Sequence, residues 1–584
     1  MNRGSLLVLG LGSVMLSLAL GCASHHSTSE DDSKATLSID PPSSTLMIVG
    51  TTPATESFTA TATYPDGTTR DVTADAMFAI DAGYGSFVQS ALTMTTAGKT
   101  TVTGTWLGKQ ATAEVIATEL GTRVDPTVTA MYPGFDPSWF NAPDDPTRAP
   151  TIVYPPAAVI MPRNIGDFDV HWTDASTNKI FEVSLVTSFT NYRVYVLGGN
   201  GTAGAGPDPS WMAFLASEWT AAVGADIAIQ LQVRGIAGPS PTGVGSSAPQ
   251  LVSLSNEAMN GGLYYWAAAG TTSPEGIFRH DVANAGQPAQ EYMTRNQTNN
   301  RCVACHVLSR DGTKMAITWD GGNGAANFLD VGSRVFQTEA NKWNFGTFTP
   351  DGNQFLGVEG GTLVVRKYVD QSVVSTMPGG GWVTHPDLSP DGTKLVYVRP
   401  QVTHVDWSFG SGEVFIRSYD QGTGSFGPEQ MLVADASNNY YPSFSPDGAW
   451  VLFNKSADNS TAGAYNNASA ELWVIKSDGS APALQLTSAN QSTGLTDSWG
   501  RWAPFAQTFG AANEPMYWIT VSSKRNFGVR LFGAGRPQIW MTPFFGARAT
   551  AGMDPSSIAF RLPFQNIDSD NHIAQWTTQI VPIQ

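Results

Sequence analysis

The chain has 584 residues, of which 49 are Asp or Glu and 32 are Lys or Arg, so its formal net charge is -17. This acidic balance argues against DNA, RNA or an anionic lipid surface as a partner. The length is too great for one hydrophobic core and predicts three or more domains. Only 14% of the residues are charged, whereas Gly numbers 59 and Pro 36, which favours an all-β protein of short strands and tight turns.

The first residues have the pattern of an export signal. Arg3 is followed by an almost wholly apolar run from Leu6 to Leu20, which is too short to span a bilayer, and small residues precede Cys22. We therefore expect residues 1–21 to be a signal peptide. The segment resembles a bacterial lipobox, which implies lipid attachment at Cys22. An ordinary secretory signal with an incidental cysteine is the alternative.

The segment that follows Cys22 is small and polar and cannot bury a core. Residues 22–34 are therefore expected to form a lipidated cysteine and a flexible tether. Ala23 and Ser24 stand where the resemblance would place an Asp as an inner-membrane retention signal. The prediction is a protein held by its lipid in the cell envelope, at the outer membrane.

Residues 35–118 alternate apolar and polar side chains in short runs, as in a sheet that is packed on one face. The clearest runs are 36–39, 58–64, 77–80 and 100–106. Tyr64, Asp66-Gly67-Thr68 and Asp71-Val72-Thr73 resemble the bacterial Ig-like group 2 family, which implies a β-sandwich that acts as a spacer.

Residues 119–255 contain further strand-like runs, at 167–172, 180–185, 192–196 and 226–233, between Pro-rich stretches. Runs of this length and spacing predict a second β-sandwich, for which a fibronectin-like fold is one candidate.

A repeat occupies residues 256–584. A five-residue turn motif occurs four times in one register, and a strand follows each copy. The copies end in Asp311-Gly312, Asp351-Gly352, Asp391-Gly392 and Asp447-Gly448. Ser-Pro-Asp-Gly forms a type I turn, and a repeat of about 40 residues is typical of propeller blades. The motif resembles the TolB-type propeller repeat. With a degenerate copy at 502–505, a unit at 261–280 and closure by 572–581, six blades are expected.

Cys302-Val303-Ala304-Cys305-His306 lies inside this repeat and has the CxxCH spacing of a c-type haem attachment motif. Two thiols add to the porphyrin vinyl groups, and the His binds iron. Aligned on the Asp-Gly turns, Cys305 matches Phe345, His385 and Tyr441, so we expect it on an inner strand beside the central channel. His385 is the first candidate for a sixth ligand. The alternatives are Met315, Met293, His280 and His404.

Other readings of the motif remain open. Cys302 and Cys305 could form a disulfide, natural in an oxidising compartment, or a redox dithiol. With His306 they could bind zinc, although a structural zinc takes four ligands. No hydrolase signature is present, so an enzyme is not expected. Two functions follow: an anchored haem c protein for electron transfer or redox sensing, with an unknown redox partner, or a surface module that binds protein or glycan.

Overall fold

The computed structural model describes residues 32–584, except 199–211, 224–225, 271–272, 285, 321–324, 338, 340–341, 461–462, 491–494 and 532–534. Cys22 and most of the expected tether lie outside the described residues. The described part is almost wholly β, which confirms the all-β fold class. No helix within it is long and apolar enough to cross a membrane.

The N-terminal domain consists of short strands around one core. All four strands that the alternation predicts are confirmed. The buried side chains include Phe58, Leu92 and Val102, none of which is accessible to solvent. The strands are β1 (Thr36–Asp40), β2 (Ser43–Val49), β3 (Ala54–Ser57), β4 (Thr59–Thr63), β5 (Thr69–Asp71), β6 (Met77–Ala79), β7 (Gly85–Val88), β8 (Ala91–Met94) and β9 (Gly98–Trp106).

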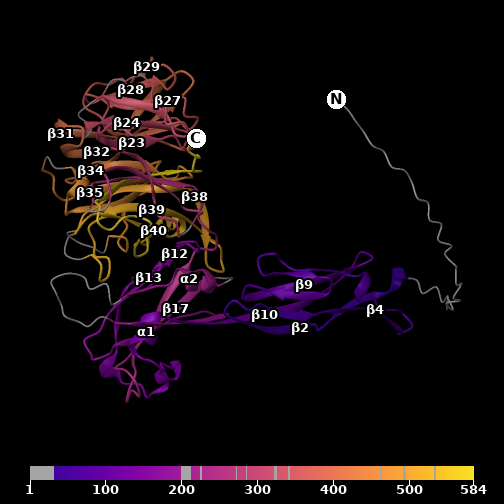
Figure 1. Cartoon of the computed structure of the whole chain (residues 1–584). Coiled ribbons are helices and arrows are strands. Elements are labelled where there is room, and N and C mark those ends of the chain that lie inside the picture. The colour runs from indigo at the N-terminus through magenta and orange to yellow at the C-terminus, as the bar shows by residue number, and fades with distance from the viewer. Residues whose placement is uncertain are drawn as a thin grey trace, which may run out of the picture.

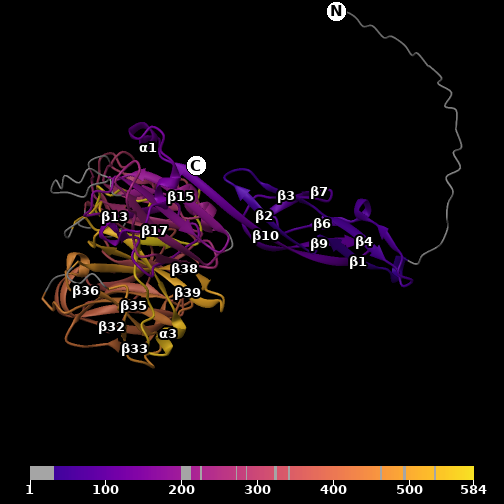
Figure 2. The ribbon, with the colours of Figure 1, turned by 90° about the horizontal axis from the view of Figure 1, so that it is seen from below.

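One long strand, β10 (Lys109–Val124), runs out of this domain into the next (Figures 1 and 2). Its first part pairs with β9 and β2, and its last part, from Glu119, pairs in parallel with β15 (Thr190–Leu197). The expected boundary between residues 118 and 119 therefore falls within a continuous strand. Because the hydrogen-bonded sheet does not stop there, the two domains share one ten-stranded sheet.

The second domain packs this sheet against a small second sheet and a helix that the sequence did not predict. The helix, α2 (Ala216–Val223), places Trp219 against Phe168, with ring centroids 4.2 Å apart. All four predicted strand runs are present. The remaining elements are α1 (Pro126–Met131), β11 (Thr151–Tyr154), β12 (Ile160–Met161), β13 (Asp169–Thr173), β14 (Ile180–Val186), β16 (Met212–Phe214), β17 (Ala228–Ile236), β18 (Gly245–Ser246) and β19 (Gln250–Leu254).

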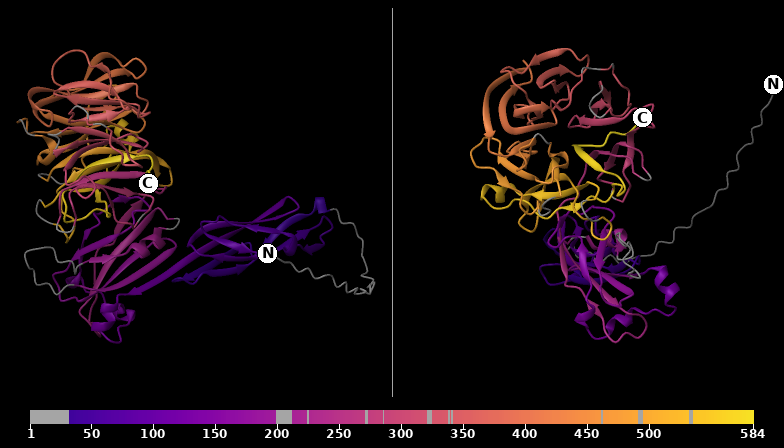
Figure 3. Two further views of the ribbon diagram at one scale, coloured as in Figure 1. Left: turned by 45° about the horizontal axis from the view of Figure 1, so that its top comes forward. Right: turned by 90° about the vertical axis from the view of Figure 1, so that its left-hand side faces the viewer.

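The C-terminal part is a six-bladed propeller, as predicted, with its blades arranged in a ring (Figure 3). The first blade contains β20 (Gly262–Ala267), β21 (Gly276–Asp281) and β22 (Gln290–Thr294), and the second contains β23 (Val303–Leu308), β24 (Lys314–Trp319) and β25 (Ala326–Asp330). The others are β26 (Gly346–Phe348) to β29 (Val373–Thr376), β30 (Thr384–Leu388) to β33 (Ser425–Val433), β34 (Asn438–Phe444) to β37 (Leu484–Gln485), and β38 (Asp497–Phe509) to β41 (Phe560–Arg561).

The intervening strands of these four blades are β27 (Gln354–Glu359), β28 (Thr362–Lys367), β31 (Lys394–Val405), β32 (Ser408–Asp420), β35 (Trp450–Ser456), β36 (Ala470–Lys476), β39 (Glu514–Ser523) and β40 (Gln538–Phe544). A short helix, α3 (Gly546–Thr550), follows β40. The ring is closed by the last strand, β42 (Asn571–Thr577), which pairs with β20 of the first blade. The predicted closure is therefore confirmed.

The propeller and the second domain share one hydrophobic core. The same cluster of buried residues contains Trp172 and Trp219 from the second domain and Trp518 and Phe560 from the sixth blade. Polar contacts reinforce the junction, since Asn256 Nδ2 donates to Thr508 Oγ1 at 3.0 Å. The second domain is thus fixed to the propeller, and the N-terminal domain extends from the side (Figures 1 and 3).

Candidate functional site

The inner strands of the blades bring equivalent residues together around the central channel. Five of the six strands carry a register shift at this point, for example between Val303 and His306 of β23 and between Thr384 and Asp387 of β30. The alignment of the repeat copies is confirmed, because each of the matched residues lines at least one of two adjoining cavities in the channel. The ring consists of Cys305, Phe345, His385, Tyr441, Trp499 and Ile573.

A large apolar cavity of about 960 Å³ opens at one end of this ring. Its volume lies at the upper end of the roughly 300–1,000 Å³ that is usual for ligand and cofactor sites. Cys302 and Cys305 both line it. Six of the other fifteen lining residues are aromatic: Trp266, Phe345, Trp407, Tyr441, Tyr465 and Trp499.

The strand that carries the CxxCH motif is held at both of its edges. Trp266 Nε1 donates to the carbonyl of Val303 at 2.9 Å, and the backbone amide of Asp320 donates to the carbonyl of Cys302 at 3.0 Å. No disulfide joins Cys302 and Cys305 in the described structure, and both residues are partly exposed. Burial raises the pKa of the Cys305 thiol, so it is held in its neutral form.

His306 and His385 both line a narrower cavity of about 20 Å³ that lies next along the channel. It adjoins the large cavity, because Cys305, Phe345 and Trp499 form part of both walls. His306 is 1% exposed and His385 is 3% exposed. The structure therefore brings the predicted axial ligand and the first candidate for a sixth ligand into one space.

The hydrogen bonds of His385 define which nitrogen carries its proton. Its Nδ1 accepts from the backbone amide of Tyr441 at 3.4 Å, and burial holds its pKa well below the usual range. A neutral ring that accepts at Nδ1 carries its hydrogen on Nε2. This Nε2 is buried and has no partner among the described residues. Iron ligation through Nε2 would require the proton to move to Nδ1 and the long bond from Tyr441 to break.

The alternative sixth ligands are placed elsewhere. Met293 and Met315 are buried in the core between the first two blades, and His280 stacks on Phe564 with ring centroids 3.9 Å apart. None of these three lines either cavity. The side chain of His404 lies outside the described residues. His385 is therefore the one candidate from the sequence that the described structure places beside His306.

The residues of the motif do not form a compact cluster of metal ligands. Throughout the described ranges, no group of three or more His, Cys, Asp or Glu side chains could hold a metal ion, and Cys302, Cys305 and His306 are no exception. A structural zinc site needs four ligands around one point.

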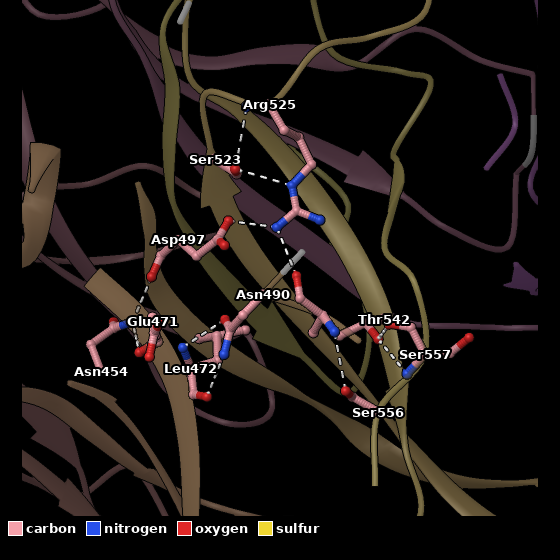
Figure 4. A network of polar contacts seen from close by, with 11 residues as sticks. Asn454, Glu471, Leu472, Asn490, Asp497, Ser523, Arg525, Thr542, Ser556 and Ser557 are labelled. Carbon is pink, nitrogen blue, oxygen red and sulfur yellow. Dashed lines mark hydrogen bonds and ion pairs between the residues drawn. The ribbon is translucent and has the colours of Figure 1, made fainter. Parts of the chain in front are cut away.

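Part of the site could not be found from the repeat pattern. Trp407 and Tyr465 come from an extended hairpin of the fourth blade and a loop of the fifth, where the chain departs from the 40-residue repeat. Trp499 did carry a signal, since alignment of the degenerate copy places it opposite Tyr441. Its backbone amide donates to Asn454 Oδ1 at 2.9 Å, and Asn454 belongs to the buried network of Figure 4.

These observations define a six-bladed β-propeller protein with two neighbouring cysteines at one mouth of its channel. No family model and no curated protein matches the sequence. The chain is similar to TolB from Acinetobacter baumannii, with 13% identity, a TM-score of 0.37 and coverage of 66% of this chain and 90% of that one.

Two further solved structures resemble the chain. A protein described as TolB from Agrobacterium tumefaciens is 14% identical, with a TM-score of 0.31 and coverage of 55% of this chain and 99% of that one. Hydrazine synthase from Kuenenia stuttgartiensis is 12% identical, with a TM-score of 0.24 and coverage of 37% and 75%. The propeller assignment rests on the six sheets themselves, and likeness at this level says nothing about ligand or activity.

Proposed function

We propose that this protein is an exported haem c protein whose propeller holds the cofactor at one mouth of the central channel. The observation that carries the proposal is the position of the CxxCH motif. Cys302 and Cys305 lie on the wall of an apolar, aromatic cavity of about 960 Å³, and His306 lies in the adjoining space with His385. An apolar pocket with a few convergent polar groups is the usual form of a cofactor site.

The residues of the site fit the chemistry of attachment. Each S–H group adds across one vinyl double bond, with sulfur bonding to one carbon and hydrogen to the other, so no oxidant is required. The addition consumes two thiols, and no disulfide joins Cys302 and Cys305 in the described structure. The neutral Cys305 thiol must lose its proton to react, since the thiolate is the nucleophile.

The surrounding side chains would bind and orient the group. The aromatic wall excludes water, and the buried His306 could reach the iron only if it lies where the two cavities adjoin. A bound haem supplies one-electron chemistry, which supports electron transfer or redox sensing. Trp407 is 41% exposed at the rim, so the cavity wall extends to solvent, where a redox partner could dock.

The test is the visible spectrum and intact mass of the mature chain made in a periplasm with the haem c maturation machinery. We expect a haem c spectrum and the mass of one covalent haem, both lost in Cys302→Ser/Cys305→Ser. A matched control is Ser411→Ala, in strand β32 three residues after the cavity-lining Ser408, which should retain the haem. A colourless protein that is two hydrogens lighter than the dithiol form would instead establish a disulfide and a binding propeller.

Lipid attachment at Cys22 and an outer-membrane location belong to the same proposal. They rest on the lipobox resemblance and on the absence of an Asp after the cysteine. Labelling with a radioactive fatty acid, with Cys22→Ser as the control, tests the lipid attachment separately from the haem. An unlabelled but exported protein would favour the ordinary secretory signal.

A further inference from the structure

The other end of the propeller channel is polar. Two residues beyond the ring that contains Cys305, the same six strands present a second ring: Val307, Thr347, Asp387, Ser443, Arg501 and Gln575. Both rings face the channel, because the residues of each line cavities along it. The second ring lines a separate cavity of about 130 Å³. The channel therefore changes from an apolar mouth, through the histidine cavity, to a polar end.

Arg310 adds a second cation at this end, at a position where the repeat favours another residue. The equivalent turn residues are Pro350, Pro390 and Pro446. The turn is closed in the same way, since Gly312 donates to the carbonyl of Ser309 at 2.9 Å and Gly392 donates to that of Ser389 at 2.8 Å. Proline suits this position because its ring presets φ. The second blade thus has Arg310 in place of a turn-stabilising proline, and the Arg310 guanidinium lies beside the cavity.

The charges at the polar end do not balance. Arg501 donates to the carbonyl of Gly500 at 2.9 Å, and Arg310 makes no side-chain hydrogen bond or ion pair with the described residues. The one acidic side chain in the wall, Asp387, accepts from the backbone amide of Phe444 at 2.8 Å and from Thr347 Oγ1 at 3.4 Å. It attracts both arginines electrostatically but closes no ion pair with either among the described residues. Two cations therefore face one carboxylate in a partly desolvated space.

Two further observations indicate an occupant. Burial lowers the pKa of both Arg310 and Arg501 and raises that of Asp387, so the positive charge of this end lacks the solvation it would have in water. The hydroxyl of Ser443, a residue that is 4% exposed, has no hydrogen-bond partner among the described residues. Buried polar groups of this kind are normally paired. A ligand with acceptor oxygens would accept hydrogen bonds from the Arg310 and Arg501 guanidinium groups and from the Ser443 hydroxyl.

We propose that this end of the channel binds a small anion with a planar carboxylate or oxyanion group, held by Arg310, Arg501 and the Ser443 hydroxyl. The guanidinium fork matches such groups with two parallel hydrogen bonds. The cavity of about 130 Å³ sets the size. It is equivalent to roughly four waters at about 30 Å³ each, which admits formate or acetate and excludes a sugar acid. The site is separate from the proposed haem attachment, since neither Cys302 nor Cys305 lines it.

Isothermal titration calorimetry of the full chain with sodium formate tests this site, with sodium gluconate holding the ionic strength. We expect saturable binding of one formate and at least a tenfold weaker affinity in Arg310→Pro. This variant restores the residue that the other repeats carry, so its thermal unfolding in gluconate should match that of the wild type. Arg310→Gln provides a second variant, and Arg417→Gln, an arginine outside the channel, should bind formate normally.

Three results would overturn the proposal. The first is no saturable heat in the wild type, and the second is unchanged affinity in both Arg310 variants. The third concerns the haem, because formate can also bind iron. Cys302→Ser/Cys305→Ser, which cannot attach haem, should bind formate as the wild type does. Loss of binding in this variant alone would place the anion on the iron, whereas a colourless wild type that binds formate would overturn only the haem proposal.

Discussion

Asn454 connects the fifth blade to the inner strand of the sixth, and its removal should weaken the propeller. Its side chain is completely buried in β35. The amide nitrogen Nδ2 donates to the carbonyl of Asp497 at 2.7 Å and to that of Glu471 at 3.1 Å (Figure 4). The oxygen Oδ1 accepts from the backbone amide of Trp499 at 2.9 Å. One side chain thus satisfies three backbone groups, two of which belong to the strand that carries Trp499.

The variant Asn454→Leu keeps the number and branching of the side-chain heavy atoms and removes all three hydrogen bonds. Each contributes on the order of 1 kcal/mol, and a buried group left unpaired costs at least as much, so the free energy of unfolding should fall by about 3 kcal/mol. No cavity is created, and the larger methyl groups of Leu can only add to the loss through overpacking. The left-handed conformation of Trp499, with φ of 57°, should also lose its support, which links this change to the wall of the large cavity.

Urea unfolding of the full chain, followed by tryptophan fluorescence, measures the loss. The chain has several domains, so each resolved transition is fitted separately. Asn353→Ala is the control, because Asn353 lies in an exposed turn and its side chain bonds only to Asp351 of that turn and, at 3.4 Å, to Lys314 of the preceding blade. Its effect should stay within about 0.5 kcal/mol. A loss below about 1 kcal/mol in Asn454→Leu would show that the three groups find other partners and would refute the reasoning.

Two other predictions concern histidines of the propeller. In the haem-loaded protein, His385→Phe should convert a six-coordinate low-spin spectrum to a five-coordinate one if His385 binds the iron, and an unchanged spectrum would exclude it as a ligand. Burial lowers the pKa of His280 to about 4 from a usual 6.5. As the pH drops from about 6.5 to 4, His280 of the unfolded chain therefore binds a proton before that of the folded chain does. The free energy of unfolding should fall over this range. The loss over this range should be about 3 kcal/mol. His280→Phe, which keeps the stack on Phe564, should make the urea midpoint less dependent on pH over the same range. An equally steep profile in the variant would assign the effect to other groups.

The propeller could be predicted because its information is local and repeated. Each Ser-Pro-Asp-Gly turn fixes a hairpin by the geometry of four residues, and the strand after it alternates in a fixed phase. Helix α2 had no comparable signal, since its eight residues include Trp219 and Thr220 and form a helix where they pack against the sheet. The continuity of β10 was also hidden, because alternation persists through a strand whether one domain or two lie along it.

The candidate site was predictable to the extent that it follows the repeat register. Cys305 and His385 hold the same position in different blades, so one alignment places both at the channel. The register does not report the hydrogen bond from Tyr441 to His385, which decides the protonated nitrogen, because that contact depends on the backbone of a neighbouring blade. Arg310 is the one residue of the four aligned turn positions that is not proline. The sequence alone did not indicate a role for it, because only the structure shows that this turn borders a cavity.

The two proposed sites constrain each other through the shape of the channel. Cys302 and Cys305 line the apolar mouth, so a haem attached there would cover that end. Solutes could then approach the narrow cavity of His306 and His385 only from the polar end, past Arg501, which lines both the polar and the narrow cavities. A haem at one mouth and an anion at the other would therefore lie on opposite sides of the histidines. The cations that hold the anion would then select what reaches the iron.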